Sequence, residues 1–265
     1  MGKPGREAST EDEPQDELES GNSTDIRAVS RAAQILGLFS PTQPQLTTTF
    51  VATRLKMNRT TAYRYCMSLV TAKLLERTDG SEFVPGPILL QLGAFALGRR
   101  DILGIAPPHM RALSATADAT AVLSLWGSTG PIVSAVEEDT RRNVLVTVRL
   151  GTHLHMTTAQ ARLFHAFHPD QLLMGRLLAN LPEPEHEQLV TQIAEARAAG
   201  YAVQLSKRGI TIVAAPVFDD RGMCAALALL ATRDVLSTNR DSAQVSALID
   251  TARELTREMG GKPLD

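Results

Sequence analysis

The chain has few aromatic residues and very few cysteines. Only 4% of its 265 residues are Phe, Trp or Tyr, and it contains one Trp and two Cys. Cys66 and Cys224 lie far apart and belong to no Cys-x-x-Cys or Cys/His cluster, so the sequence supports neither a disulfide framework nor a zinc site. We expect both to be buried apolar residues.

A long apolar run is also missing. No stretch approaches the roughly 18 consecutive apolar residues of a membrane-spanning helix, and the N-terminus lacks the basic-then-apolar pattern of a secretory signal. We therefore expect a cytoplasmic protein with no membrane partner. At 265 residues and 43% hydrophobic content, the chain is long enough for two globular domains.

The common catalytic motifs are absent from the sequence as well. It has no GxSxG, no P-loop, no HExxH and no Cys/His dyad with an orienting group. His153, His155, His165 and His168 lie within a short segment, but no carboxylate or cysteine completes a ligand set with metal-binding spacing. We interpret these histidines as solvated or packed side chains and Trp126 as a core residue, and we predict no metal, no cofactor and no enzymatic activity.

The net charge of −2 conceals an uneven distribution. Residues 1–25 carry eight acidic and two basic side chains, a net charge of −6. Because they include almost no large apolar residues, we predict a disordered acidic tail there. Residues 26–100 carry ten Lys or Arg and three acidic residues, a net charge of +7. Such a basic segment is typical of a nucleic-acid-binding module, although a solvated charged surface has the same composition.

Residues 26–85 have the pattern of a winged helix-turn-helix domain. A first helix is predicted from a cap at Asp25 to about Phe39, with an apolar face formed by Val29, Ala32, Ala33, Leu36 and Phe39. A short second helix follows hydroxyl caps at Thr47–Thr49. After a break, Asn58 can cap a third helix that runs to about Thr71, and its buried stripe is predicted to be Ala62, Tyr65, Cys66, Leu69 and Val70. A hairpin with its turn at Asp79 and Gly80 completes the order of three helices and a wing.

The rest of the chain predicts a linker helix over residues 86–100, beginning at Pro87, and an α+β domain over residues 101–260. We expect an antiparallel sheet covered by helices. Its strands are predicted over residues 120–126, 131–137, 144–149, 209–217 and 223–230, and its helices over residues 105–117, 158–199 and 242–259.

The third helix of the first domain has the chemistry of a DNA-recognition helix. A small, polar and basic outer face at the N-terminal end of such a helix can read base edges in a major groove about 12 Å wide. An ordinary surface helix is the alternative from spacing alone. Candidate contacts to a double-stranded DNA operator are Lys56, Arg59, Thr60, Thr61, Tyr63, Arg64 and Arg77. Among them, Lys56 in the turn and Arg77 on the wing are expected to contact phosphates.

Several fragments, taken in order, resemble the IclR (isocitrate lyase regulator) family. The N-terminal fragments are RAVSRAAQIL at 27–36, MNRTTAYR at 57–64 and VPGP at 84–87. In the second half, TAQAR at 158–162 is similar to the family's Thr-Ala-x-Gly-Lys loop, and GYAV at 200–203 and AAPVFD at 214–219 match its C-terminal signature.

The resemblance implies a GAF-like effector-binding domain, dimers formed largely through the DNA-binding halves, and tetramers in many members. It also implies a small-molecule effector, bound near Thr158, Ala159, Ala161, Ile212, Ala228 and Leu230. Three departures stand out. Lys56 replaces a turn glycine, Ala161 and Arg162 replace Gly-Lys, and Ala228 and Leu230 stand where the family has effector-binding hydroxyls.

The apolar lining at Ala228 and Leu230 favours an apolar or aromatic acid, or a degenerate pocket. We therefore predict a homodimeric or homotetrameric regulator that binds DNA and an effector. The alternative is an enzyme or signalling module whose N-terminal helices mediate only protein contacts.

Overall fold

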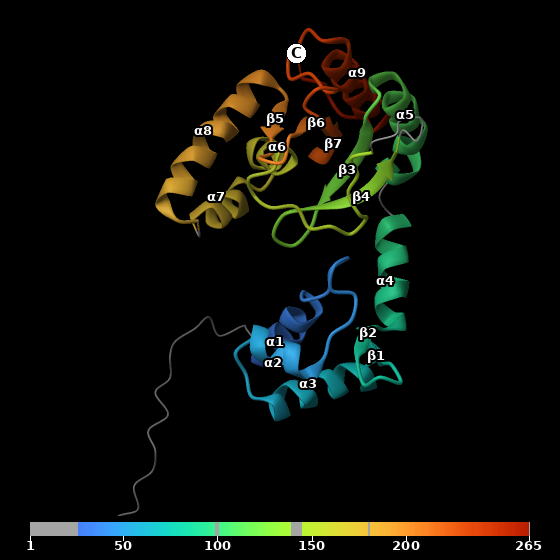
Figure 1. The fold of residues 1–265 in the computed structure, drawn as a ribbon, viewed down its shortest axis with the longest axis vertical. Coiled ribbons are helices and arrows are strands. Elements are labelled where there is room, and N and C mark those ends of the chain that lie inside the picture. The colour runs from blue at the N-terminus through green and yellow to red at the C-terminus, as the bar shows by residue number, and fades with distance from the viewer. Residues whose placement is uncertain (1–25, 99–100, 139–144, 180, 265) are drawn as a thin grey trace, which may run out of the picture.

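The computed structural model describes residues 26–98, 101–138, 145–179 and 181–264, so the predicted acidic tail lies outside the described residues. Two bodies are connected by the single helix α4 (Figure 1). The N-terminal body contains α1 (Arg27–Leu36), α2 (Thr48–Arg54), α3 (Arg59–Thr71), β1 (Leu75–Arg77) and β2 (Phe83–Pro85).

Local capping explains where the two helices of the helix-turn-helix begin. Thr47 accepts a hydrogen bond from the Phe50 amide at 3.1 Å, and Asn58 accepts one from the Thr61 amide at 2.7 Å. Each cap satisfies an amide that the first helical turn leaves without a partner. The predicted caps of the second and third helices are thus confirmed.

The N-terminal body has its own apolar core. Strand β2 pairs with β1 in an antiparallel hairpin, and Leu46 and Phe83 exchange backbone hydrogen bonds of 2.9 and 2.8 Å. These bonds tie the wing to the connection between α1 and α2. The buried core residues are Ile35, Leu46, Val51, Ala52, Ala62, Cys66, Leu69, Leu75 and Phe83.

The predicted apolar face of the first helix is confirmed only in part. Ala32, Leu36 and Phe39 pack against the core. Val29 is 63% exposed and Ala33 is also exposed, whereas Ile35 is fully buried. The helix ends at Leu36, before the expected Phe39. Helical spacing identified the helix but only part of its inward face, because apolar residues occur on more than one side of it.

Helix α4 (Pro87–Gly98) begins at Pro87 as predicted and none of its described residues is buried. Gly86, immediately before it, is required by close packing: a Cβ there would lie 2.5 Å from the Lys73 carbonyl oxygen and 2.8 Å from the Leu74 carbonyl carbon. The Pro-Gly-Pro sequence therefore fixes how the wing leads into the linker helix.

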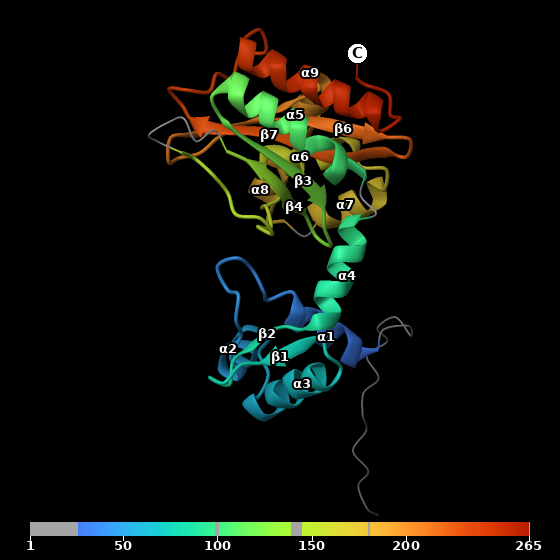
Figure 2. The same ribbon diagram turned by 90° about the vertical axis from the view of Figure 1, so that its right-hand side faces the viewer.

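The C-terminal body is a sheet sandwiched between helices. Its five described strands are antiparallel, in the order β4-β3-β7-β6-β5. Helices α5 and α9 cover one face, and α6 and α8 lie on the other (Figures 1 and 2). The strands are β3 (Thr120–Trp126), β4 (Pro131–Glu137), β5 (Ala202–Leu205), β6 (Ile210–Asp219) and β7 (Gly222–Thr232). The helices are α5 (Asp101–Ala117), α6 (Ala159–Phe167), α7 (Gln171–Ala179), α8 (Glu183–Ala199) and α9 (Ala243–Glu258).

Two details of this body differ from the sequence prediction. Residues 145–149 of the expected strand 144–149 form no strand, and residue 144 lies outside the described residues. Instead Thr120 donates to the Val146 carbonyl at 2.5 Å, a side-chain bond that does not continue a ladder. The edge strand β5 was not predicted, because four residues carry too little pattern to identify a strand.

Among the described residues, no helix combines the length and the apolar composition that a membrane-spanning segment needs.

Candidate nucleic-acid interface and effector site

The candidate DNA-contacting residues of α3 lie together on its N-terminal, outward surface. Arg59, Thr60, Tyr63 and Arg64 are exposed and Thr61 is half-buried. The opposite side of the helix buries Ala62, Cys66 and Leu69 in the core, which fixes the helix against the domain. The polar face of α3 is therefore exposed at the surface of the domain.

A shallow hollow lies on the same face of α3. It is lined by Thr61, Arg64, Tyr65 and Ser68, which share one face over two turns of the helix. Tyr65 and Ser68 were not among the sequence candidates: Tyr65 was assigned to the buried stripe, and the structure shows it half-buried. Tyr65 lies four residues after Thr61, and Ser68 lies four residues after Arg64, so helical spacing was the available signal.

The wing and the turn each present one exposed cation. Arg77 on β1 donates from Nη2 to the Ser81 hydroxyl at 2.7 Å, which orients the guanidinium along the wing. Lys56 lies in the turn between α2 and α3 with φ of 50°, in the left-handed region. That conformation is strained for a residue with a side chain, so a glycine would fit the turn better.

Four of the six effector-site candidates pack into one cluster on the α6 face of the sheet. Ala159 of α6 and Ala228 of β7 are fully buried there, and Ile212 and Leu230 pack against them. Ile212 and Leu230 are also directly paired between β6 and β7. Ala161 is buried on α6 but does not belong to this cluster, and Thr158 serves as the N-cap of α6.

The N-terminus of α6 is occupied by groups of the chain itself. The Thr158 hydroxyl accepts from the Ala161 amide at 3.3 Å, and the Gln204 side chain on β5 accepts from the Ala159 amide at 3.1 Å. Arg162 donates to the carbonyls of Thr157 at 3.2 Å and Val203 at 3.0 Å. Burial lowers the pKa of the Arg162 guanidinium, since it is surrounded by protein. Gln204 and Arg162 therefore fasten the loop before α6 to β5.

Buried polar atoms gather beside this cluster, between β3 and α6. Ser124 is 0% and His165 is 2% exposed. Among the described residues, the Ser124 hydroxyl, the Trp126 Nε1 and both His165 ring nitrogens have no hydrogen-bond partner. Burial lowers the pKa of His165 to about 4, with a smaller contribution from neighbouring His168.

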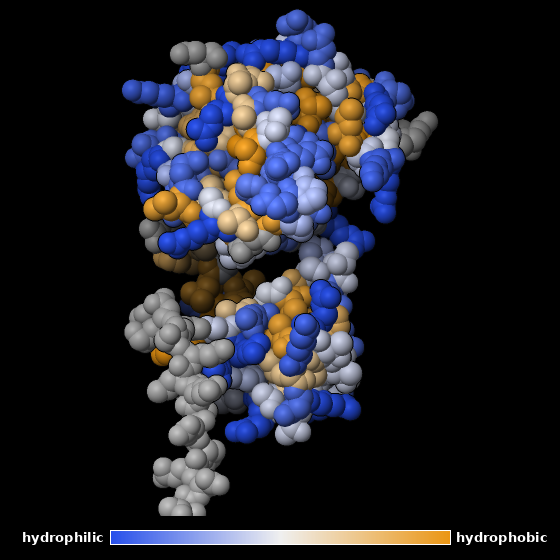
Figure 3. Space-filling model, turned by 90° about the vertical axis from the view of Figure 1, so that its left-hand side faces the viewer, coloured by the Kyte–Doolittle hydropathy of each residue, from blue (hydrophilic) through white to orange (hydrophobic). Residues whose placement is uncertain are grey.

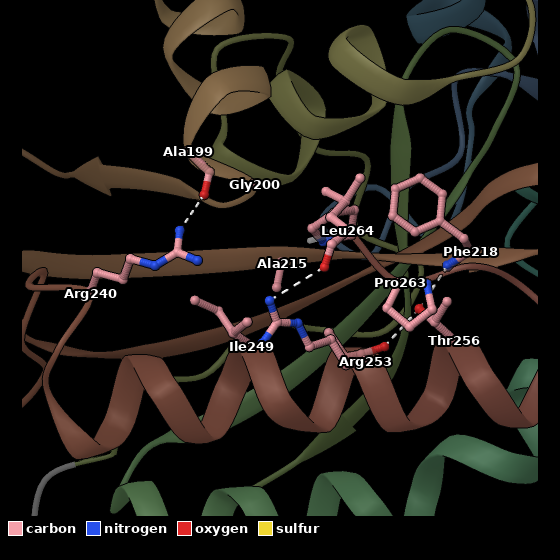
Figure 4. A pocket seen from close by; sticks show the side chains of 12 residues that line it. Ala199, Gly200, Ala215, Phe218, Arg240, Ile249, Arg253, Thr256, Pro263 and Leu264 are labelled. Atoms are coloured by element: carbon pink, nitrogen blue, oxygen red, sulfur yellow. Dashed lines mark hydrogen bonds between the residues drawn. The ribbon is translucent and has the colours of Figure 1, made fainter.

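A separate small cleft of about 30 Å³ lies on the other side of the sheet, between α9, β6 and residues 263–264 (Figure 4). Its two guanidinium groups already bind the chain: Arg240 donates to the Ala199 carbonyl at 2.6 Å and Arg253 to the Leu264 carbonyl at 3.3 Å. We therefore interpret this cleft as a seam that holds the C-terminal segment and the end of α8 in place.

Comparison with known proteins covers both bodies. Residues 28–79 match the IclR helix-turn-helix domain, and residues 94–257 match the family described as bacterial transcriptional regulator IclR C-terminal. The chain belongs to the IclR family. It is a transcription regulator with a helix-turn-helix DNA-binding domain and an effector-binding C-terminal domain, joined by α4, as the sequence predicted. None of the curated proteins matches the sequence.

Solved structures of IclR proteins have the same fold. An IclR regulator from Alicyclobacillus acidocaldarius is 27% identical, with a TM-score of 0.70 over 89% of this chain and 100% of that one. A putative regulator from Silicibacter sp. TM1040 is 23% identical, with a TM-score of 0.78 over 89% and 98%. An IclR homologue from Microbacterium hydrocarbonoxydans, complexed with 4-hydroxybenzoate, is 20% identical, with a TM-score of 0.66 over 88% and 98%.

This IclR chain contains buried polar residues that sequence reasoning did not assign to a site. Trp126 was interpreted as core and His165 as packed or solvated, and Ser124 was not considered. The period-two alternation of β3 places Ser124 and Trp126 on one face, which was the available signal. Nothing in the sequence indicated that α6 would bring His165 to that face.

Proposed function

We propose that the protein binds a roughly palindromic DNA operator and changes its affinity for that operator when its C-terminal domain binds a small molecule. In this proposal residues 26–85 form the DNA-binding domain and residues 101–260 form the effector-binding domain. Residues 86–100 form the linker between them. The observation that carries it is the exposed polar and basic face of α3, flanked by Lys56 in the turn and Arg77 on the wing.

Each candidate has a role in this proposal. Arg59, Thr60, Thr61, Tyr63 and Arg64 enter the major groove, where guanidinium and hydroxyl groups bind base edges. Lys56 and Arg77 neutralise phosphates on either side and so position α3 without specifying sequence.

A homodimer, or a homotetramer built from it, is supported by apolar surface on the N-terminal half of the chain. Ile26 and Val29 at the start of α1 are 67% and 63% exposed, and α4 exposes four large apolar side chains: Leu90, Leu92, Phe95 and Leu97. Figure 3 shows apolar surface among hydrophilic side chains on the N-terminal body. Apolar surface of this extent is commonly buried in an interface, and two-fold symmetry would present two α3 helices to a palindrome.

The effector in this proposal is an apolar or aromatic acid. Ala159, Ile212, Ala228 and Leu230 provide an apolar wall, as ligand sites commonly do. The Microbacterium homologue complexed with 4-hydroxybenzoate supports an aromatic acid as the effector.

The test begins with sequencing the chromosomal fragments that the purified protein retains. Fluorescence anisotropy then gives affinities for a recovered fragment and for random DNA of equal length over a series of salt concentrations. We expect tighter binding to the recovered fragment and a steep loss of affinity with salt, because bound phosphates release counterions. Equal affinity for both DNAs would refute the proposal and favour a protein-contact module instead.

A further inference from the structure

The strongest unexplained feature of the molecule is the set of buried polar atoms between β3 and α6. Native proteins rarely leave buried hydroxyl, indole and imidazole groups without hydrogen bonds, because each has lost its bonds to water. Ser124, Trp126 and His165 contribute four such atoms, and no other residue of the described chain provides one to this interface.

These three residues lie at the interface between β3 and α6. Ser124 and Trp126 are two apart on β3 and therefore lie on the same side of the sheet. The His165 ring of α6 meets Trp126 edge-on, with ring centres 6.0 Å apart. Phe164 and His168 bring two more rings to Trp126, with centroids at 5.3 and 5.5 Å.

This polar group is continuous with the predicted effector site. Phe164 and Trp126 belong to the same apolar cluster as Ala159, Ala228 and Leu230. A ligand lying along that cluster would have aliphatic contacts at one end and aromatic rings with polar atoms at the other. Such a combination orients a ligand, because the apolar wall supplies affinity and a few polar groups supply direction.

The chemistry of the three groups favours an uncharged hydroxyl. With its pKa lowered to about 4 by burial, His165 is neutral at physiological pH and offers one donor and one acceptor. Trp126 offers a donor and Ser124 offers either. A ring hydroxyl both accepts and donates, so it can bond these neutral groups without placing a charge beside them.

We propose that Ser124, Trp126 and His165 form the polar end of the effector site and bind the ring hydroxyl of a hydroxylated aromatic ligand. Its ring packs against Trp126 and Phe164. The proposal rests on the effector function proposed above and narrows it from aromatic acids to those that carry a hydroxyl group.

The protein supplies its own reporter, because Trp126 is its one tryptophan. The full-length protein, without DNA, is titrated with 4-hydroxybenzoate, benzoate and 4-methylbenzoate while tryptophan emission is recorded. The methyl group replaces the hydroxyl at nearly equal volume. We expect 4-hydroxybenzoate to change the emission and to bind at least roughly tenfold more tightly than the other two, the equivalent of one lost buried hydrogen bond.

His165→Phe tests the polar contact directly. It keeps a ring of similar size and removes two unpartnered nitrogens, so the variant should fold. We expect its affinity for 4-hydroxybenzoate to fall roughly tenfold, with its affinity for 4-methylbenzoate unchanged. His186→Phe makes the same chemical change on α8 and should behave as wild type.

Two results would overturn the proposal: no response to 4-hydroxybenzoate, or equal affinities for the three compounds in wild type and His165→Phe alike. Because these titrations contain no DNA, loss of operator binding with intact hydroxyl selectivity would refute only the regulatory function.

Discussion

The two bodies of this IclR protein present their functional groups in opposite ways. On the N-terminal body the candidate residues are exposed or half-buried and five of them lie on one helix, α3. On the C-terminal body they are largely buried and come from β3, α6, β6 and β7. A surface that reads DNA needs only one well-oriented helix, whereas a small-molecule site needs walls on several sides.

This difference separates function from stability in one body and couples them in the other. Removing an exposed side chain of α3 should change affinity for DNA with little effect on folding. Changing a buried residue near α6 should alter both ligand affinity and the free energy of unfolding, because the same contacts serve packing. The predictions below test this contrast, beginning with the largest expected effect.

The largest effect is expected from pH at His165. Its pKa in the folded protein is about 4, below the ordinary value of 6.5. Between these values the unfolded chain binds a proton that the folded chain does not, so acid favours unfolding. The stability that the neutral side chain preserves is complete above pH 6.5 and is lost as pH falls to 4, amounting to about 3 kcal/mol.

Urea denaturation of wild type and His165→Phe at pH 7 and near pH 4.5 measures this contribution. The variant should lose less stability on acidification than wild type, since carboxylates titrate in both proteins and cancel in the difference. If both proteins lost the same free energy of unfolding, the pKa of His165 would not be lowered by folding. Burial would then not couple function to stability at this residue.

The same contrast explains which features of the structure could be predicted from the sequence. Thr47 and Asn58 are local caps, and the polar face of α3 follows from helical spacing, so the sequence indicated the DNA-binding surface. The strands predicted at 120–126 and 131–137 coincide with β3 and β4. These features depend on neighbours within a few residues.

Features set by distant contacts could not be derived in this way. Which side of α1 is buried depends on α2, α3 and the wing, so Val29 was assigned to the wrong face. The contact of His165 with Trp126 depends on how α6 lies across the sheet, which no local pattern encodes. Residues 145–149 have the composition of a strand but pair with no strand in the described structure.

Arg64→Ala and Arg77→Ala should distinguish base reading from phosphate binding. If Arg64 binds a base edge, its loss should weaken operator binding by about 1 to 3 kcal/mol and random DNA much less. Arg77→Ala should weaken both alike and reduce the salt dependence, because it removes a phosphate contact. Thermal melts should show both variants folding as wild type. A shared loss of stability would show that the α3 face is also structural.

Leu230→Ser tests the predicted apolar wall on the buried side of the contrast. Leu230 is half-buried against Ala228 and Ile212. The substitution should lower the free energy of unfolding by about 1 to 2 kcal/mol, less than at a fully buried site. It should also weaken 4-hydroxybenzoate binding, while operator affinity without ligand stays unchanged. A destabilised protein with unaltered affinity for 4-hydroxybenzoate in calorimetric titrations would place the site elsewhere.

Lys56 offers the smallest and most discriminating change, because its strain and its charge can be separated. With φ of 50°, the residue is held in a conformation that glycine adopts freely. Lys56→Gly should therefore raise stability by about 1 kcal/mol, partly offset by the greater freedom of glycine in the unfolded chain. Lys56→Ala removes the same charge but keeps the strained backbone. Both variants should lose affinity for operator and random DNA equally, with a smaller salt slope, while only the glycine variant gains stability. If the two variants differed in DNA affinity, backbone geometry in the turn, rather than the Lys56 charge, would govern how α3 meets the groove.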